Sequence, residues 1–458
     1  MQNNDLAQFK TYLDGSNGQV IKENTSAIKY GYDLDLQIYK ADTADGITQV
    51  NPSPLLESDG IESKLPVSSV KESVGMSSDI WTEMLENKEL LSSQYDILAG
   101  AWPKAFNEVV ILVNENNEIS DMTLYALGLK DTAEFEEIQK KIEAGEEVER
   151  ADYKEATFTY DDLLNLEFKL LDNTAYYEKA DGVWVDKRNN ETFMKAALEN
   201  ATTIKITGIL RPSEEAAAAS IGGTIGYTSE LTQYMVKRVN DSEIVKEQKK
   251  NPDVNVFTGS DFIVADNMSN EELLATIPAD RKAQLMAMPE AERTTYLASY
   301  QQTLAATYDS NLEKLGVVDL EKPSAVNLYL KDFDSREAVT QAIEDYNRQQ
   351  KDAGHDEYVI EYTDMVGIMT ASITNIIDMI TYLLIGFVSI SLVVSSIMIG
   401  IITYISVLER TKEIGILRSI GASKRDISRV FNAETTIVGL AAGLIGIGLT
   451  LLLSLIHI

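Results

Sequence analysis

Two long runs of apolar residues stand near the end of the chain. Residues 379–408 hold no Asp, Glu, Lys or Arg and are dense in Ile, Leu, Val and Ser, and residues 435–458 form a second run without charge. About 20 apolar residues suffice to cross a hydrocarbon core of ~30 Å. We therefore predict one transmembrane helix at about 379–408 and another at 435–458. A pair of buried helices in a soluble protein is the less favoured alternative.

The segment between these runs, residues 409–434, is basic. Its cations are Arg410, Lys412, Arg418, Lys424, Arg425 and Arg429. Short loops rich in Lys and Arg stay on the cytoplasmic side of a membrane. The loop is therefore expected in the cytoplasm, and residues 1–375 are expected outside. In the second run, Gly439 and Gly443 are four positions apart and predict a small-residue face for close helix packing.

Upstream of the apolar runs, strand and helix patterns alternate. Residues 27–39 alternate apolar and polar side chains, which predicts one half-buried strand. Further strands are predicted at 108–113 and 203–210. Residues 131–154 are charge-dense and predict a solvated helix or hairpin. Residues 269–315 are rich in Ala, Glu, Leu and Gln and predict a helical insert that is broken near Pro278 and Pro289.

Residues 325–362 carry a strand–helix–strand pattern. A strand is predicted at 325–330, a capping box at residues 334–337 begins a helix that reaches about Asn347, and a return strand is predicted at 358–362. This matches half of a split βαβ arrangement. The predicted fold is thus an α+β extracytoplasmic domain (1–375), with mixed strands and helices and a split βαβ-like unit. Two transmembrane α-helices follow within 376–458.

Charge divides the chain in the same place. The net charge is −32, from 40 basic and 72 acidic residues, and residues 376–458 hold only six of the basic and five of the acidic groups. Residues 1–375 therefore carry 34 − 67 = −33, and the remainder +1. Nucleic-acid binding requires a basic surface, so no nucleic-acid partner is expected.

The composition also excludes several kinds of active site. The chain has no Cys and only two His, which excludes thiolate and multi-histidine metal sites. It has no G-x-x-x-x-G-K-[ST] motif, and its Asp clusters do not fit the spacing of a calcium loop. The sequence therefore predicts no catalytic residue, no metal site and no cofactor bound by this chain.

The basic loop combines its charges with regularly spaced apolar residues. Ile414, Leu417 and Ile420 are three apart and would share one face of a helix, and Gly421 is suited to end it. Two interpretations follow from the residues alone. One is a connector that only maintains topology, and the other is an amphipathic helix at the cytoplasmic surface that docks a partner.

The stretch from residue 409 to 427 has the pattern E-R-x-x-E-I-G-x-x-[KR]-[AS]-[IL]-G-A without a gap. It resembles the FtsX-like domain of MacB-type ABC transporter permeases. More loosely, residues 95–110 resemble the G-x-W-P…N-E-V-V segment of the large Gram-positive extracytoplasmic form. The resemblance implies that the loop is the coupling helix for an ATPase, through Glu409, Arg410, Lys412, Glu413, Ile414, Gly415, Leu417, Arg418, Gly421 and Ala422.

The resemblance also implies a function. It implies a permease of the cell membrane that couples ATP hydrolysis by a nucleotide-binding partner, fused or separate, to movement of the extracytoplasmic domain (mechanotransmission). The exported cargo would be peptides, antibiotics or lipoproteins. A homodimer or pseudo-dimer in the lipid bilayer is expected, with ATP bound by the partner and no enzyme activity in this chain. The alternative is an FtsX-like signalling adaptor that regulates a cell-wall hydrolase.

The family plan places one transmembrane helix before the external domain and three after it. This sequence offers only the second helix and most of the third. The first residues also lack the basic start and apolar core of a signal peptide. We therefore expect the chain to be a fragment of a longer membrane protein.

Overall fold

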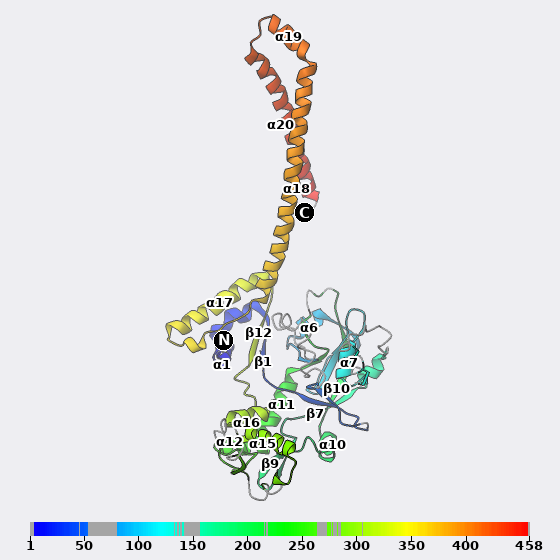
Figure 1. Ribbon diagram of the computed structural model, residues 1–458, viewed down its shortest axis with the longest axis vertical. Helices are drawn as coiled ribbons and strands as arrows, with labels where there is room; N and C mark the ends of the chain where they lie inside the picture. The colour runs from blue at the N-terminus through cyan, green and yellow to red at the C-terminus, as the bar shows by residue number, and fades with distance from the viewer. Residues whose placement is uncertain are drawn as a thin grey trace. The chain divides into compact units, whose positions relative to one another are not determined.

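The computed structural model describes residues 4–456 except 45, 54–79, 132, 135–136, 138–139, 142–155, 215, 217–218, 263–272, 276, 278–281, 283–284 and 305. It divides into two compact units, Met1–Thr363 and Asp364–Ile458 (Figure 1). The first mixes strands and helices, and the second contains two long apolar helices. The predicted fold class is confirmed at this level.

An eight-stranded mixed sheet forms the centre of the first unit. Its main order is β3-β2-β7-β10-β6-β11-β4. The long strand β10 pairs in parallel with β6 along one edge, and antiparallel with β7 and then β5 along the other. The predicted strands at 108–113 and 203–210 are confirmed as β6 and β10. The strands are β2 (Gln37–Lys40), β3 (Gln49–Asn51), β4 (Trp81–Glu83), β5 (Tyr95–Gly100), β6 (Glu108–Leu112), β7 (Glu167–Leu171), β10 (Thr202–Pro212) and β11 (Ile225–Tyr227).

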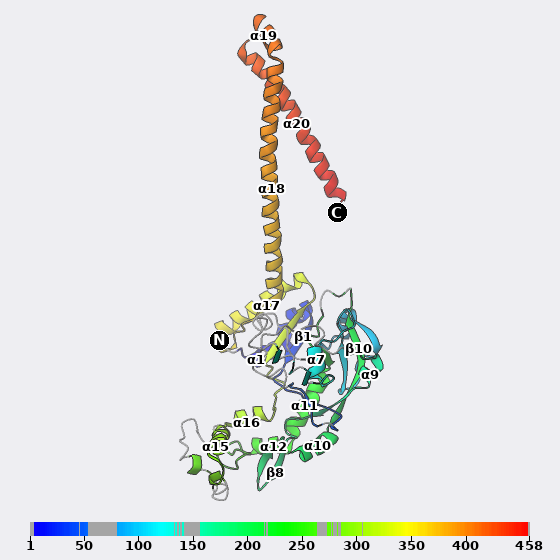
Figure 2. The ribbon, with the colours of Figure 1, turned by 45° about the vertical axis from the view of Figure 1, so that its right-hand side comes forward.

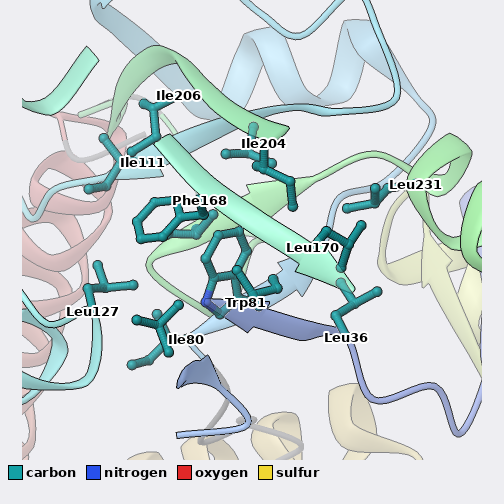
Figure 3. Packing of buried hydrophobic residues seen from close by; sticks show 14 of the residues in the cluster. Leu36, Ile80, Trp81, Ile111, Leu127, Phe168, Leu170, Ile204, Ile206 and Leu231 are labelled. Carbon is teal, nitrogen blue, oxygen red and sulfur yellow. The ribbon is translucent and has the colours of Figure 1, made fainter. Parts of the chain in front are cut away.

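The main core lies against this sheet. Trp81 and Phe168 meet edge to face with their ring centroids 5.3 Å apart, and Ile111, Ile204 and neighbouring aliphatic side chains surround them (Figure 3). Leu127, Leu163 and Leu231 contribute from the helical side of the cluster. The helices on this side are α7 (Asp121–Ala126), α9 (Tyr160–Leu164) and α11 (Ser229–Asp241), and α6 (Lys88–Gln94) precedes β5.

A second, smaller sheet joins the beginning of the chain to residues near 330. Strand β1 (Thr25–Gly31) pairs antiparallel with β12 (Ala325–Leu330). Phe9, Leu13 and Tyr346 lie in the core between this sheet and its helices. Those helices are α1 (Leu6–Asp14), α2 (Gln19–Asn24) and α17 (Phe333–Asp352), with a short 3₁₀ turn, η1 (Ser16–Gly18), between the first two.

The prediction of one strand over residues 27–39 is wrong. The chain instead forms β1 and β2, which belong to different sheets. The backbone N–H of Leu34 donates to the carbonyl of Tyr32 at 2.8 Å, a tight turn that redirects the chain after β1. The apolar alternation misled because both strands are half-buried: Ile28 packs on the α1 and α17 core, and Ile38 packs in the main core.

Two details of the predicted strand–helix–strand unit are also wrong. Residues 358–362 are not a strand, because η3 (Asp356–Tyr358) is a 3₁₀ turn and the following residues have no strand partner; β12 pairs with β1 instead. Helix α17 begins earlier than predicted. Its N-cap is Asp332, whose carboxylate accepts from the backbone N–H of Ser335 at 2.8 Å. The aspartate three positions before Ser335, rather than the one next to it, makes this bond.

A third group of elements carries its own core. The hairpin β8 (Tyr177–Ala180) and β9 (Val183–Asp186) lies with α10 (Glu191–Glu199), α12 (Glu243–Lys250) and α16 (Tyr308–Lys314). Tyr177, Val245 and Leu315 are buried there. Helix α15 (Glu290–Leu304) begins directly after Pro289 and lies within the region where the helical insert is predicted. The predicted break at Pro278 and most of 131–154 lie outside the described residues.

The second unit is a helical hairpin (Figure 2). It consists of α18 (Met365–Glu409), α19 (Thr411–Ser419) and α20 (Lys424–Ile456). Both long helices are apolar enough to cross a membrane, and neither span has buried residues. Each begins before its predicted span. Helix α18 starts at Met365 because the Asp364 carboxylate accepts from the backbone N–H of Gly367 at 2.8 Å.

Candidate functional site

The turn between the two long helices, residues 409–434, is called the tip below. Arg410 separates α18 from α19, and its backbone N–H donates to the carbonyl of Ser406 at 3.3 Å. The guanidinium of Arg410 reaches α20 and forms an ion pair with Glu434 at 3.0 Å. This bond joins the two ends of the tip, so that α19 is held between α18 and α20.

The residues Ile420–Asp426 form two consecutive helix caps. Gly421 has φ +105°, the backbone N–H of Gly421 donates to the carbonyl of Arg418, and that of Ala422 donates to the carbonyl of Leu417, each at 3.1 Å. This is a Schellman ending, in which glycine is favoured because it has no Cβ. Ser423 then accepts from the backbone N–H of Asp426 at 3.2 Å and starts α20. The G-A-S-x-x-D order of the motif thus specifies a sharp helix–turn–helix.

The surface of α19 mixes charge with apolar area. Ile414 is half-buried, whereas Leu417 and Ile420 are 46% and 79% exposed, so the predicted apolar face is divided between the hairpin and solvent. Lys412, Glu413 and Arg418 are all exposed. Such a surface is suited to docking a protein partner, because exposed apolar side chains flanked by charges of both signs are typical of interfaces.

The two predicted packing glycines lie on α20. Apart from its chain neighbours and the backbone of its own helix, no described heavy atom lies within 4 Å of a Cβ placed on Gly439 or Gly443. The face that they define is therefore open within this hairpin. Among the described residues, no group of three or more His, Cys, Asp or Glu side chains could hold a metal ion.

In the first unit, the segment over residues 95–110 builds one wall of a cavity. Gly100 has φ +72°, and a Cβ there would lie 2.1 Å from the carbonyl oxygen of Thr207. Glu108 accepts from the backbone N–H of Lys104 at 2.7 Å and fixes the intervening loop. The loop carries Trp102 and Phe106 into the lining of a cavity of about 930 Å³. Sequence reasoning noted this motif but not the cavity.

A half-buried pair of opposite charges, Lys29 and Glu83, lies beside this cavity. The ammonium of Lys29 donates to the backbone carbonyl of Glu83 at 2.6 Å, and the carboxylate of Glu83 accepts from the hydroxyl of Thr232. Burial raises the pKa of Glu83 and lowers the pKa of Lys29, because each group loses water around its charged form. Nothing in the sequence pattern distinguishes Glu83 from the many exposed carboxylates, so sequence reasoning missed it.

The second unit combines membrane-length helices with a match to a known permease domain. Its two apolar helices have no buried face, are joined by a basic, capped turn, and are long and apolar enough to cross a membrane. Residues 385–457 match the FtsX-like permease C-terminal domain. In this part of the chain, the second unit is therefore similar to permeases of the FtsX-like type.

Several relatives of this chain are named as permeases. An uncharacterized ABC transporter permease of Methanocaldococcus jannaschii is 47% identical over 73 residues, which is 16% of this chain and 20% of the relative. The uncharacterized ABC transporter permease YknZ of Bacillus subtilis is 26% identical over 257 residues, 53% of this chain and 63% of the relative. The macrolide export ATP-binding/permease protein MacB of Bdellovibrio bacteriovorus is 49% identical over 70 residues, 15% of this chain and 11% of the relative.

The extent of these similarities differs between the two units. The chain spans less than two thirds of the length of each of these relatives. The similarity to YknZ covers 257 residues, more than the 458 − 363 = 95 residues of the second unit, so it extends into the first. No solved structure matches the chain.

Proposed function

We propose that this chain is the permease part of a MacB-like ABC transporter, in which ATP hydrolysis by a nucleotide-binding partner moves the extracytoplasmic domain. The observation that carries the proposal is the tip: a short helix, capped at its end, that exposes Lys412, Glu413 and Arg418 between two helices long enough to span a membrane. The ATPase would be a separate chain or a fused domain. One relative is named an ATP-binding/permease protein.

The proposed topology follows from charge. The tip holds six Lys and Arg residues and would lie in the cytoplasm, where the ATPase is found. Residues 1–375, with net charge −33, would lie outside, and the protein would be multi-pass. Permeases of this kind would act as a homodimer or pseudo-dimer in the bilayer. The open glycine face of α20 is available for such helix contacts.

The proposed mechanism needs no chemistry from this chain. The tip would bind the partner through exposed charges and the apolar side chains of Leu417 and Ile420. Nucleotide-driven closure of the partner would displace the tip, and α18 would carry the displacement. At ~1.5 Å per residue, this helix of 45 residues is about 67 Å long, more than twice the hydrocarbon core. Peptides, antibiotics or lipoproteins remain the proposed cargo.

A charge exchange on α19 tests the contact with the ATPase. In the full-length protein with its ATPase, Glu413→Lys combined with Arg418→Glu keeps the net charge but inverts the pattern that faces the partner. We expect substrate-stimulated ATP turnover to fall on the order of tenfold, since inverted close charge pairs cost more than 1.4 kcal/mol. The matched control is Glu191→Lys with Lys195→Glu, an exposed ion pair on α10.

The outcomes of this experiment separate the candidate functions. Undiminished stimulated turnover in the Glu413 and Arg418 variant would contradict the assigned contact. If deletion of the parent gene leaves peptide tolerance unchanged but abolishes cell-wall hydrolase activity, the FtsX-like adaptor replaces the exporter. In that case the tip would still contact an ATPase, but the external domain would act on a hydrolase.

A further inference from the structure

The link that leads from the first unit into α18 is held by two asparagine side chains. Asn347, on α17, accepts from the backbone N–H of Ile360 at 2.8 Å and donates to its carbonyl at 2.9 Å. Asn4, just before α1, accepts from the backbone N–H of Glu361 at 2.8 Å and donates to its carbonyl, also at 2.8 Å. Each pair of bonds is called a clasp below.

A clasp satisfies the backbone in the way that a neighbouring strand would. A carboxamide presents one acceptor and two donors, so it can bond to both the N–H and the carbonyl of one residue. Residues 358–362 have the apolar pattern of a strand but no strand partner. The clasps supply hydrogen bonds at the two consecutive residues, 360 and 361, where a strand ladder is missing.

Both clasping residues are themselves fixed. Asn347 follows Tyr346, which is 1% exposed in the core of α17. Asn4 precedes Asp5, whose carboxylate caps α1 by accepting from the backbone N–H of Ala7 at 3.1 Å. Between the clasps, Ile360 is 5% exposed and packs in the same core as Phe9. The link is therefore anchored to the first helix and to α17 at once.

The anchored residues are very close to α18 along the chain. Only residues 362–364 separate Glu361 from Met365, the first residue of the helix, and Asp364 is its N-cap. A free link of this length would behave as a flexible tether and would absorb small displacements. The hydrogen bonds at Ile360 and Glu361 remove this flexibility from those two residues and leave only residues 362–364 between the anchored backbone and α18.

Helices α1 and α17, to which the link is anchored, contact the main sheet through the β1–β12 sheet. Ile28 and Val326 of the β1–β12 sheet pack on the core that contains Ile360. Ala27 and Tyr329 pack on a second buried cluster, against which Trp102 also packs. The amide of Asn87 also donates to the carbonyl of Ser26 in β1 at 2.8 Å. A displacement of the α1 and α17 layer would thus reach the wall of the large cavity through packed elements.

We propose that Asn4 and Asn347 are positioning residues that make this link a stiff joint, so that displacement of α18 is delivered to the β1–β12 sheet. The proposal rests on the proposed function, because it concerns how the external domain is moved. Neither residue touches a substrate or the ATPase contact. Their role is to prevent the link from stretching or rotating independently.

The first test measures stiffness alone. In the full-length protein in nanodiscs, hydrogen exchange of residues 359–363 is compared between the wild type, Asn4→Ala, Asn347→Ala and the double variant. We expect each single variant to speed exchange at its own partner amide on the order of tenfold, and the double variant to speed both. The control Asn200→Ala removes an asparagine bonded only within its own helix. Unchanged exchange in the double variant would overturn the proposal.

The second test measures transmission. Spin labels on β10 and on the start of α18 report the ATP-driven change in distance, and ATP turnover is measured in the same samples. We expect the double variant to lose at least half of the distance change while basal turnover is unchanged, and Asn347→Asp, which keeps only the acceptor, to lie between. If the double variant kept the full ATP-driven distance change, the proposal that the clasps transmit the displacement would be overturned. A wild type with no ATP-driven change would overturn the proposed function, and the exchange result would still decide whether the clasps stiffen the link.

Discussion

The two units of this chain differ in where their apolar side chains lie: the first buries them and the second exposes them. In the first unit, Ile111, Ile204 and Ile209 are completely buried around a mixed sheet. In the second, Ile390 is 64% exposed and Leu452 is 59% exposed, although these helices are the most apolar part of the chain. In water this exposure would be unfavourable by roughly 25 cal/mol for each Å² of apolar surface. The contrast supports the proposal that the hairpin lies in lipid and the first unit in water.

Charge follows the same division. Residues 1–375 carry the acidic excess, whereas nearly all charges of the hairpin lie at its tip. A charge in the hydrocarbon is costly, which supports the proposed topology with the tip outside the bilayer core. Under the proposed topology the two units have different solvents, so the same substitution should have different effects in each.

A phenylalanine in each unit gives the largest expected contrast. Phe168→Ala removes a ring that is 2% exposed and packed on Trp81, and we expect it to lower the free energy of unfolding of the first unit by about 3–5 kcal/mol. Phe387→Ala removes a ring that is 62% exposed in α18, and we expect little change. Urea unfolding followed by near-UV circular dichroism measures both. Equal losses of unfolding free energy in the two variants would contradict the view that the two units treat exposed apolar side chains differently.

The glycine face of α20 gives the next contrast. Gly439→Leu or Gly443→Leu should be tolerated by the isolated hairpin, because no described heavy atom beyond the chain neighbours and the helix's own backbone lies within 4 Å of the added Cβ. In the assembled permease we expect each to weaken association by about 1–2 kcal/mol, since small residues allow helices to approach closely. Cross-linking in membranes measures assembly, with Gly386→Leu on α18 as the control. If Gly439→Leu, Gly443→Leu and Gly386→Leu all assembled equally well, the face defined by Gly439 and Gly443 would not be the packing face.

The half-buried carboxylate of Glu83 gives a smaller, pH-dependent effect. Because burial raises its pKa in the folded state, this group favours folding below its usual pKa near 4.5 and the contribution is lost as pH rises through the raised value. Glu83→Gln keeps an acceptor for Thr232 but cannot ionise. We expect the variant to be more stable than the wild type at pH 7 and to lose that advantage near pH 4. A constant difference across this range would contradict the assignment.

The ion pair of the tip should matter least for stability. Arg410 and Glu434 are both partly exposed, so we expect Glu434→Gln to change the stability of the hairpin by only about 0–1 kcal/mol. Gly421→Val, which forces a β-branched residue to φ +105°, should cost more, about 1–2 kcal/mol. Helix content during thermal unfolding in detergent measures both. A larger effect for Glu434→Gln would show that the pair is more important than its exposure suggests.

The hairpin was predictable from the sequence because its signals are local. Charge-free runs identify the spans, and the G-A-S order of residues 421–423 specifies a cap that needs no tertiary contact. The predicted strand at 27–39 failed because the alternation of apolar residues does not reveal which sheet a strand joins. The partner of β12 lies almost three hundred residues away in β1. The asparagine clasps were equally invisible, because Asn4 and Glu361 are joined only by the fold.

The most direct test of the central claim is the side of the membrane on which α19 lies. The chain has no cysteine, so Lys412→Cys provides a single reactive thiol on the exposed face of the tip. In intact cells that carry the full-length protein without other thiols, a membrane-impermeant maleimide should leave this site unlabelled. After permeabilisation the site should react, and a bifunctional reagent should link it to the ATPase. Labelling of Lys412→Cys from the medium in intact cells would contradict the account.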